Sequence, residues 1–174
     1  DLTCMDNYRG ISLISVPLKV LCALLAYRLA DALEEHQRLR ISQAGFRTKE
    51  EAVAQAACLY EILQRRKHTG VTSYVAFLDL QKAFDTVPHS ALVVKLYAKG
   101  VRGKLLKFIQ SLYSHSSISV RWGCTEQFGL ERGVRQGCPL SPVLFNVFMD
   151  DIFGHCEHQG VSVPGLSESI PGLL

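Results

Sequence analysis

The sequence predicts an α+β fold, a mixed arrangement of helices and strands. Several segments place apolar residues at helical spacing, whereas residues 73–79 form a short, apolar, aromatic-rich run typical of a strand buried on both faces. Residues 117–131 read as two further strands around Gly123-Cys124-Thr125. With 174 residues, 48% hydrophobic and 20% charged, the chain is long and apolar enough to bury a core.

The first helix is expected after an extended N-terminal segment, residues 7–14. Pro17 suits the first turn of a helix, because its missing N–H has no helical partner there. Apolar residues continue at helical spacing to about Gln37. The helix is therefore predicted from Pro17 to Gln37, followed by a loop that contains residues 43–47, QAGFR.

A second helix is expected to begin at Thr48. Glu51 stands three residues later, which is the spacing of a capping box. The basic residues 65–67 and then Gly70 form the pattern of a helix C-terminus, since cations suit its negative end and glycine suits the turn beyond it.

The second half of the chain is expected to begin with the buried strand 73–79, which ends in Asp79. Ser141 is expected as an N-cap, with Pro142 at the first position of the last helix. Between them, the sequence predicts two helices and the two strands of a hairpin: 88–99, 104–114, 117–122 and 126–131.

Charge and cysteine usage limit the class of protein. The formal net charge of +3 and the pI of about 8.6 suit a polyanionic partner but fall short of a dedicated nucleic-acid module. Six scattered cysteines with no C-x-x-C pair indicate reduced thiols and an intracellular protein, nuclear or cytoplasmic. The longest apolar run, 20–27, is far shorter than a membrane span, and no signal peptide is recognised.

Asp79 is a candidate metal ligand. An ionised carboxylate at the end of a buried strand loses hydration unless a cation meets it, and a metal ion is a natural partner. The alternative is an acid that is exposed at the strand end or caps the following turn. The residues of this one segment leave both interpretations open.

Four motifs stand in order along the chain: NYRGISLI (7–14), QAGFR (43–47), FLDLQKAFDTV (77–87) and GVRQGCPLSPVLFN (133–146). Each short motif is weak alone, but together they resemble the reverse transcriptases of non-LTR (LINE-type) retrotransposons, which are RNA-directed DNA polymerases. The resemblance covers nearly the whole chain. It implies one partial reverse transcriptase domain, 1–174, with polymerase fingers in 1–72 and an incomplete palm in 73–174.

The resemblance implies a catalytic role for Asp79. This residue matches the first carboxylate that ligates both Mg²⁺ ions of a two-metal mechanism, and carboxylates suit such a hard cation. The backbone carbonyl of Leu80 is implied as a further ligand.

A nucleotide pocket is implied by the same likeness. Phe84 matches the aromatic position that packs under the incoming sugar and disfavours a 2′-hydroxyl, with plain core packing as the alternative. Gln136 resembles the glutamine that lines this pocket, and Gly137 allows the backbone to approach substrate closely.

Three arginines complete the implied site. Arg9 resembles the finger arginine that reaches the triphosphate, where a guanidinium fork suits phosphate oxygens. Arg47 is expected to contact template or nucleotide, with a surface salt bridge as an equal alternative. Arg135, which flanks Gln136, is assigned to nucleic-acid binding.

The quartet Phe148-Met149-Asp150-Asp151 is similar in letters to the aromatic-x-Asp-Asp metal hairpin of polymerases. Asp150 follows Gln136 by only 14 residues, and apolar residues from Val143 onward keep helical spacing with no glycine or proline before Phe153. We therefore expect Asp150 and Asp151 on the surface of a helix, and the true hairpin beyond Leu174.

One aspartate of the usual three cannot organise two Mg²⁺ ions, so the isolated chain is expected to be inactive. In the full-length protein the expected partners are an RNA template, a DNA primer and a dNTP, with no membrane and no protein partner inferred. The other interpretations are a noncatalytic nucleic-acid-binding module on the same scaffold, or a relic that binds nothing.

Overall fold

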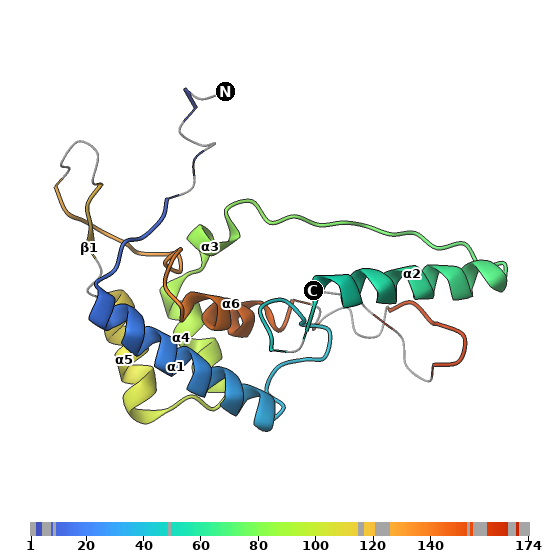
Figure 1. Cartoon of the computed structure of the whole chain (residues 1–174), viewed down its shortest axis with the longest axis horizontal. Helices are drawn as coiled ribbons and strands as arrows, with labels where there is room; N and C mark the ends of the chain where they lie inside the picture. Colours follow the sequence, from blue (N-terminus) through green and yellow to red (C-terminus); the bar gives the residue numbers. More distant parts are fainter. Residues whose placement is uncertain are drawn as a thin grey trace.

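The computed structural model describes residues 3–4, 8, 10–48, 50–114, 117–120, 126–152, 154, 160–166 and 170. In these residues the elements are helices and one small antiparallel sheet (Figure 1). Their bounds are α1 Val16–Glu35, α2 Ala52–His68, α3 Ala83–Thr86, α4 His89–Ala98, α5 Gly103–Ser114, β1 Ser117–Ile118, β2 Phe128–Gly129 and α6 Ser141–Met149. This mixture of helix and strand agrees with the predicted α+β class.

Helices α1, α4, α5 and α6 enclose the hydrophobic core. Helix α4 packs against both α5 and α6, and α1 packs against α6. Each helix buries residues four positions apart, which lie on one helix face: Leu29 and Leu33, Leu92 and Leu96, Ile109 and Tyr113, and Val143 and Val147. Burying one such leucine contributes about 1.5–3 kcal/mol, so packing of these helices dominates the stability of the fold.

The predicted helices are confirmed, with corrections at their ends. Helix α2 begins at Ala52 with Glu51 as its N-cap and no side-chain cap bond, so the predicted start at Thr48 is wrong. The N–H of Glu50 instead donates to the carbonyl of Arg47 in a turn. Leu140, not Ser141, is the N-cap of α6. Gly70 follows α2 with φ +71°, as the C-terminal pattern predicts.

The strand predicted at 73–79 is wrong. This segment is extended but unpaired, and its side chains lie in solvent, with Tyr74 92% and Phe77 85% exposed. Figure 1 shows the green segment running from the far end of α2 back to α3 as a long connection outside the group of core helices. A strand needs a neighbour for its backbone hydrogen bonds, and no described segment pairs with this one. Helix α2 likewise buries none of its residues.

The predicted hairpin is confirmed in its paired part. Ser117 lies opposite Gly129 and Ile118 opposite Phe128 in an antiparallel register. Both strands are shorter than the predicted 117–122 and 126–131, and residues 121–125 lie outside the described residues.

Among the described residues, no helix is both long enough and apolar enough to cross a membrane.

Helix α1, from the predicted fingers, shares one hydrophobic core with α4 to α6 of the predicted palm. The boundary between 72 and 73 stays a prediction.

Candidate functional site: the junction of two motifs

Backbone hydrogen bonds join the segment after Asp79 to the loop that carries Gln136. The N–H of Gly133 donates to the carbonyl of Val87 at 2.8 Å, and the N–H of Val134 donates to the carbonyl of Phe84 at 2.7 Å. Gly133 has φ +96°, and a Cβ there would lie 3.0 Å from a backbone oxygen of the facing segment. This glycine therefore permits the two motifs to meet.

Gln136 and Gly137 close the junction. The side-chain amide of Gln136 donates to Oδ1 of Asp85 at 3.1 Å. The backbone carbonyl of Gln136 accepts the N–H of Ser12 at 2.8 Å. Gly137 has φ +104°, and a Cβ there would lie 3.0 Å from the carbonyl oxygen of Ser12. The tight approach at Gly137 is thus to the chain's own N-terminal motif.

Phe84 belongs to an aromatic cluster. Its ring stacks on Phe145 of α6 at a centroid distance of 4.6 Å and meets Phe46 of the QAGFR loop edge-on at 6.0 Å. The side chain is only partly buried. Stacked aromatic pairs contribute about 0.5–1.5 kcal/mol beyond burial, so the cluster fixes the position of the Phe84 ring.

Asp79 does not sit at the end of a buried strand. It lies exposed on the unpaired extended segment, as does Leu80, so the burial that suggested a metal partner is absent. Neither Asp79 nor Gln136 lines the pocket beside Arg66 or the groove between α1 and the connection from α4 to α5. The sequence left two environments open for Asp79, burial at a strand end and exposure to solvent, and the structure shows exposure.

The residues present do not by themselves fit two Mg²⁺ ions. Within the described ranges, no three His, Cys, Asp or Glu side chains gather as metal ligands would. Asp85, six residues beyond Asp79, accepts a hydrogen bond from Gln136 instead. A two-metal site needs several carboxylates around the ions.

The acids of the FMDD quartet have contrasting surroundings, and neither lies on a hairpin. Helix α6 ends at Met149, so both follow the helix rather than lying within it. Asp150 is 2% exposed, which makes its predicted place on a helix surface wrong. Its Oδ1 accepts the N–H of Arg40 at 2.6 Å, and its Oδ2 pairs with Lys99. These cationic and backbone partners repay the cost of burying the carboxylate.

Asp151 lies beside Asp150 but is half exposed. Its Oδ1 accepts a hydrogen bond from Nζ of Lys95 at 2.5 Å. Partial burial acts to raise the pKa of Asp151, but the hydrogen bond and charge of Lys95 outweigh it and lower that pKa. Both acids are therefore engaged by lysines, Asp151 by Lys95 of α4 and Asp150 by Lys99, the C-cap of that helix.

Arg47 anchors the QAGFR loop to α1. Its guanidinium makes a two-pronged ion pair with Glu34, at 2.7 and 2.6 Å, and also donates to the carbonyls of Arg40 and Gln43. The hydrogen bond from Arg47 lowers the pKa of Glu34. The salt-bridge alternative is the one that the structure shows, in a partly buried form.

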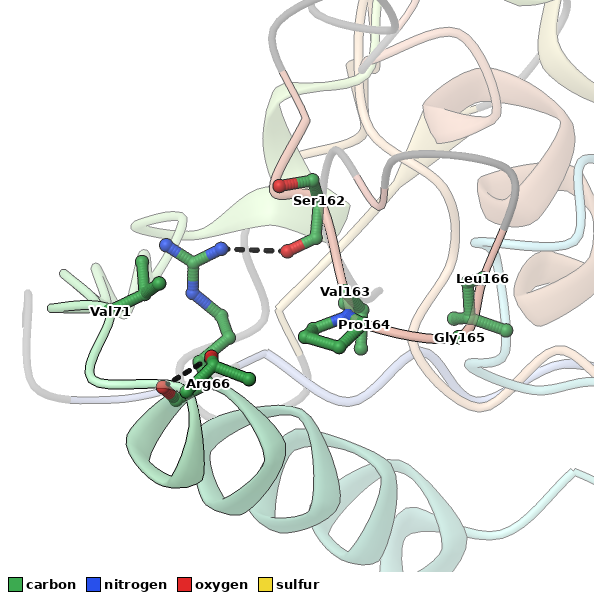
Figure 2. A pocket seen from close by; sticks show the side chains of 8 residues that line it. Arg66, Val71, Ser162, Val163, Pro164, Gly165 and Leu166 are labelled. Atoms are coloured by element: carbon green, nitrogen blue, oxygen red, sulfur yellow. Dashed lines mark hydrogen bonds between the residues drawn. The ribbon is translucent and has the colours of Figure 1, made fainter.

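The predicted site residues Arg135 and Arg9, and two arginines near the end of α2, differ in what can be described. Arg135 donates to the carbonyl of Leu112 at 3.1 Å. Arg66 reaches across to the carbonyl of Ser162 at 2.6 Å, as Figure 2 shows. Arg65 pairs with Glu61 at 2.9 Å. Arg9 lies outside the described residues.

Sequence reasoning missed a buried amide pair. Gln43 Nε2 donates to Oδ1 of Asn146 at 3.2 Å, and Asn146 Nδ2 donates to the carbonyl of Gly45 at 2.6 Å. These bonds tie the QAGFR loop to α6. Both amides stand inside the quoted motifs, and that was the available signal.

Comparison with known proteins extends these observations. A family model described as reverse transcriptase (RNA-dependent DNA polymerase) matches residues 3–164. The Pol polyprotein of the type-1 retrotransposable element R2 of Popillia japonica is 33% identical over 98% of this chain and 23% of its own length.

Two further relatives come from other elements. The RNA-directed DNA polymerase from the mobile element jockey of Drosophila funebris is 32% identical over 85% of this chain and 16% of its own length. The transposon TX1 149 kDa protein of Xenopus laevis is 29% identical over 86% of this chain and 12% of its own length. The chain thus spans less than a quarter of these relatives, and it belongs to the reverse transcriptase family of non-LTR retrotransposons.

Proposed function

We propose that this chain forms the nucleotide-pocket side of an RNA-directed DNA polymerase, which extends a primer 3′-hydroxyl on an RNA template. One observation carries the proposal. The FLDLQKAFDTV and GVRQGCPLSPVLFN motifs, about fifty residues apart, meet through backbone bonds at Phe84 and Val87 and through the Gln136–Asp85 hydrogen bond. This junction supports a joint role for the two motifs.

Phe84 is proposed to contact the sugar of the incoming dNTP. Its ring is held by Phe145 and Phe46 yet stays partly exposed, as a surface that sorts sugars must. Gln136 and Gly137 line the same pocket in this proposal. Arg9 serves the triphosphate.

Arg135 and Arg47 are proposed to have different roles. Arg135 lies beside the pocket loop and serves the nucleic acid. Arg47 acts on the template indirectly, because its nitrogens already hold the QAGFR loop to Glu34 and to two backbone carbonyls.

Asp79 is proposed as the first carboxylate of the metal site, with the carbonyl of Leu80 beside it. Reverse transcriptases generally use divalent metal ions, which supply charge neutralisation at the reacting phosphates. Magnesium is the proposed ion, as the hard cation that carboxylates suit. The remaining carboxylates belong to a hairpin outside these 174 residues, because cations already hold Asp150 and Asp151.

The proposal divides the chain into fingers, 1–72, and an incomplete palm, 73–174. Such a piece is expected to bind a primer–template but not to extend it. A primer-extension assay with Mg²⁺, together with a binding assay on the same RNA–DNA duplex, tests this expectation. Sustained Mg²⁺-dependent incorporation by the 174-residue chain would refute it.

A noncatalytic nucleic-acid-binding module is the second candidate, and the net charge of +3 is compatible with its polyanionic partner. It differs in what the full-length protein does. A full-length protein that binds primer–template with steep salt dependence and never incorporates nucleotide would support the module and exclude the polymerase.

A further inference from the structure

A groove of about 960 Å³ lies between α1 and the connection from α4 to α5. Its floor is apolar and built from buried residues, among them Leu29, Leu33 and Val101. Leu25 and Leu105 are half buried and form its apolar walls. Figure 1 shows this region, where the blue helix α1 lies over the yellow connection. None of its residues belongs to the junction described above.

The rim of the groove is positive. Five described lining residues are lysine or arginine and none is aspartate or glutamate: Arg28, Arg38, Lys99, Arg102 and Lys104. Lys99 is engaged by Asp150, and Arg102 stacks on Tyr97. Arg28, Arg38 and Lys104 form no ion pair with another described residue. Charge complementarity therefore calls for an acidic occupant.

We propose that this groove docks an acidic amphipathic helix of a separate protein. A row of apolar side chains on such a helix fits the leucine floor, and its flanking carboxylates meet the cations of the rim. Because the floor residues are already buried in the chain alone, the fold does not require a partner that stays bound in the groove. An apolar centre inside a charged rim is the anatomy of a reversible interface.

Nucleic acid fits this groove less well than an acidic helix does. Phosphates would suit the cations, but Phe108 and His36 are the two aromatic side chains among the described lining residues. Bases need a series of aromatic faces for stacking, whereas the aliphatic floor offers shape for leucine-like side chains. The inference goes beyond the polymerase function and does not depend on it.

Fluorescence anisotropy with designed peptides tests the proposal on the 174-residue chain. The probe is a labelled peptide of about 15 residues, roughly four helical turns, with leucines on one face and glutamates on the other. A scrambled peptide of the same composition controls for charge alone, and a single-stranded RNA of similar charge controls for nucleic acid. We expect the periodic peptide to bind at least about tenfold more tightly than the scrambled one.

Matched variants locate the site. Arg28→Glu with Lys104→Glu is expected to weaken the periodic peptide at least about tenfold and to gain binding of a peptide with lysine in place of glutamate. Arg65→Glu with Lys67→Glu, on α2 outside the groove, makes the same change of net charge and should leave binding unaltered. Arg28→Gln and Lys104→Gln repeat the test if the double reversal alters the circular dichroism spectrum.

Three results would overturn the proposal. The first is equal affinity for periodic and scrambled peptides. The second is equal loss in the groove and α2 variants. The third is RNA that competes with the periodic peptide and loses affinity in the groove variants, which would make the groove a nucleic-acid surface.

Discussion

At the scale of single residues, environment decides what each acid does. Asp150 and Asp151 are adjacent, yet the first is buried against Arg40 and Lys99 while the second is half exposed beside Lys95. Removing one member of a buried charge pair leaves the other uncompensated, whereas an exposed pair is screened by water. The two acids should therefore differ in their effect on stability.

Asp150→Ala is expected to lower the free energy of unfolding by about 3 kcal/mol, because Lys99 and the Arg40 N–H lose their buried partner. Asp151→Ala should cost about 0–1 kcal/mol. Urea denaturation of both variants measures the difference. Equal losses would contradict the burial of Asp150.

Two buried side chains should make the folded chain less stable at alkaline pH. Burial raises the pKa of Cys22 from 9.0 to about 12 and that of Tyr113 from 10.0 to about 12. Above pH 9 to 10 the unfolded chain releases these protons while the folded chain keeps them, so the free energy of unfolding falls as pH rises towards 12. Each group adds a slope of up to about 1.4 kcal/mol per pH unit.

Tyr113→Phe isolates the tyrosine part of this slope. Unfolding free energies from pH 8 to 11 should decline less steeply for the variant than for the unaltered chain. Parallel declines of the two proteins would show that the Tyr113 hydroxyl is not buried.

Phe84 carries the sugar-selection part of the proposed function. In a full-length polymerase that contains this sequence, Phe84→Val should raise ribonucleotide incorporation relative to deoxyribonucleotide incorporation, because the aromatic barrier is removed. Phe145→Leu, which disturbs only the supporting ring, serves as the control. An unchanged selectivity ratio in Phe84→Val would assign Phe84 to packing alone.

At the scale of elements, the helices follow from sequence because their signals are local. The apolar spacing in 17–37, 88–99 and 104–114 is read within each segment, and the structure has helices there. The strand at 73–79 fails because pairing depends on a distant neighbour that the local pattern does not contain. The start of α2 lies after the predicted Thr48, and the N–H of Glu50 donates to the carbonyl of Arg47 in a turn before it.

The candidate site, like the elements, could be predicted only in part from the sequence. The motifs predict Phe84 and Gln136 as site residues, which stays a prediction, and the structure brings their segments together. The Gln43–Asn146 pair was not foreseen because its members stand 103 residues apart. Burial of Asp150 was missed for the same reason, since Lys99 and Arg40 reach it from other elements.

The amide pair should couple the QAGFR loop to α6. Gln43→Ala and Asn146→Ala are each expected to destabilise the chain, and the double variant by less than the sum, with a coupling of about 0.5–3 kcal/mol. Thermal denaturation of the four proteins measures it. Strict additivity would show that the hydrogen bond contributes nothing.

At the scale of the whole molecule, apolar surface outside the core is the conspicuous feature. The extended segment 72–80 exposes Tyr74, Phe77 and Leu78, and α2 beside it buries nothing. Unpaired extended backbone with apolar side chains invites association with other chains. We expect the isolated chain to self-associate and to be poorly soluble, and a monodisperse monomer on gel filtration would count against this.

In the proposed function, Asp79 serves the chemistry and the FMDD pair does not. Primer extension by a full-length polymerase containing this sequence distinguishes these two assignments. Because Asp79 and Asp151 are both exposed, Asp79→Asn and Asp151→Asn should leave the fold intact. We expect Asp79→Asn to lower incorporation at least about a hundredfold and Asp151→Asn to keep it within about twofold. Retained activity in Asp79→Asn, or its loss in Asp151→Asn, would refute the catalytic role of Asp79.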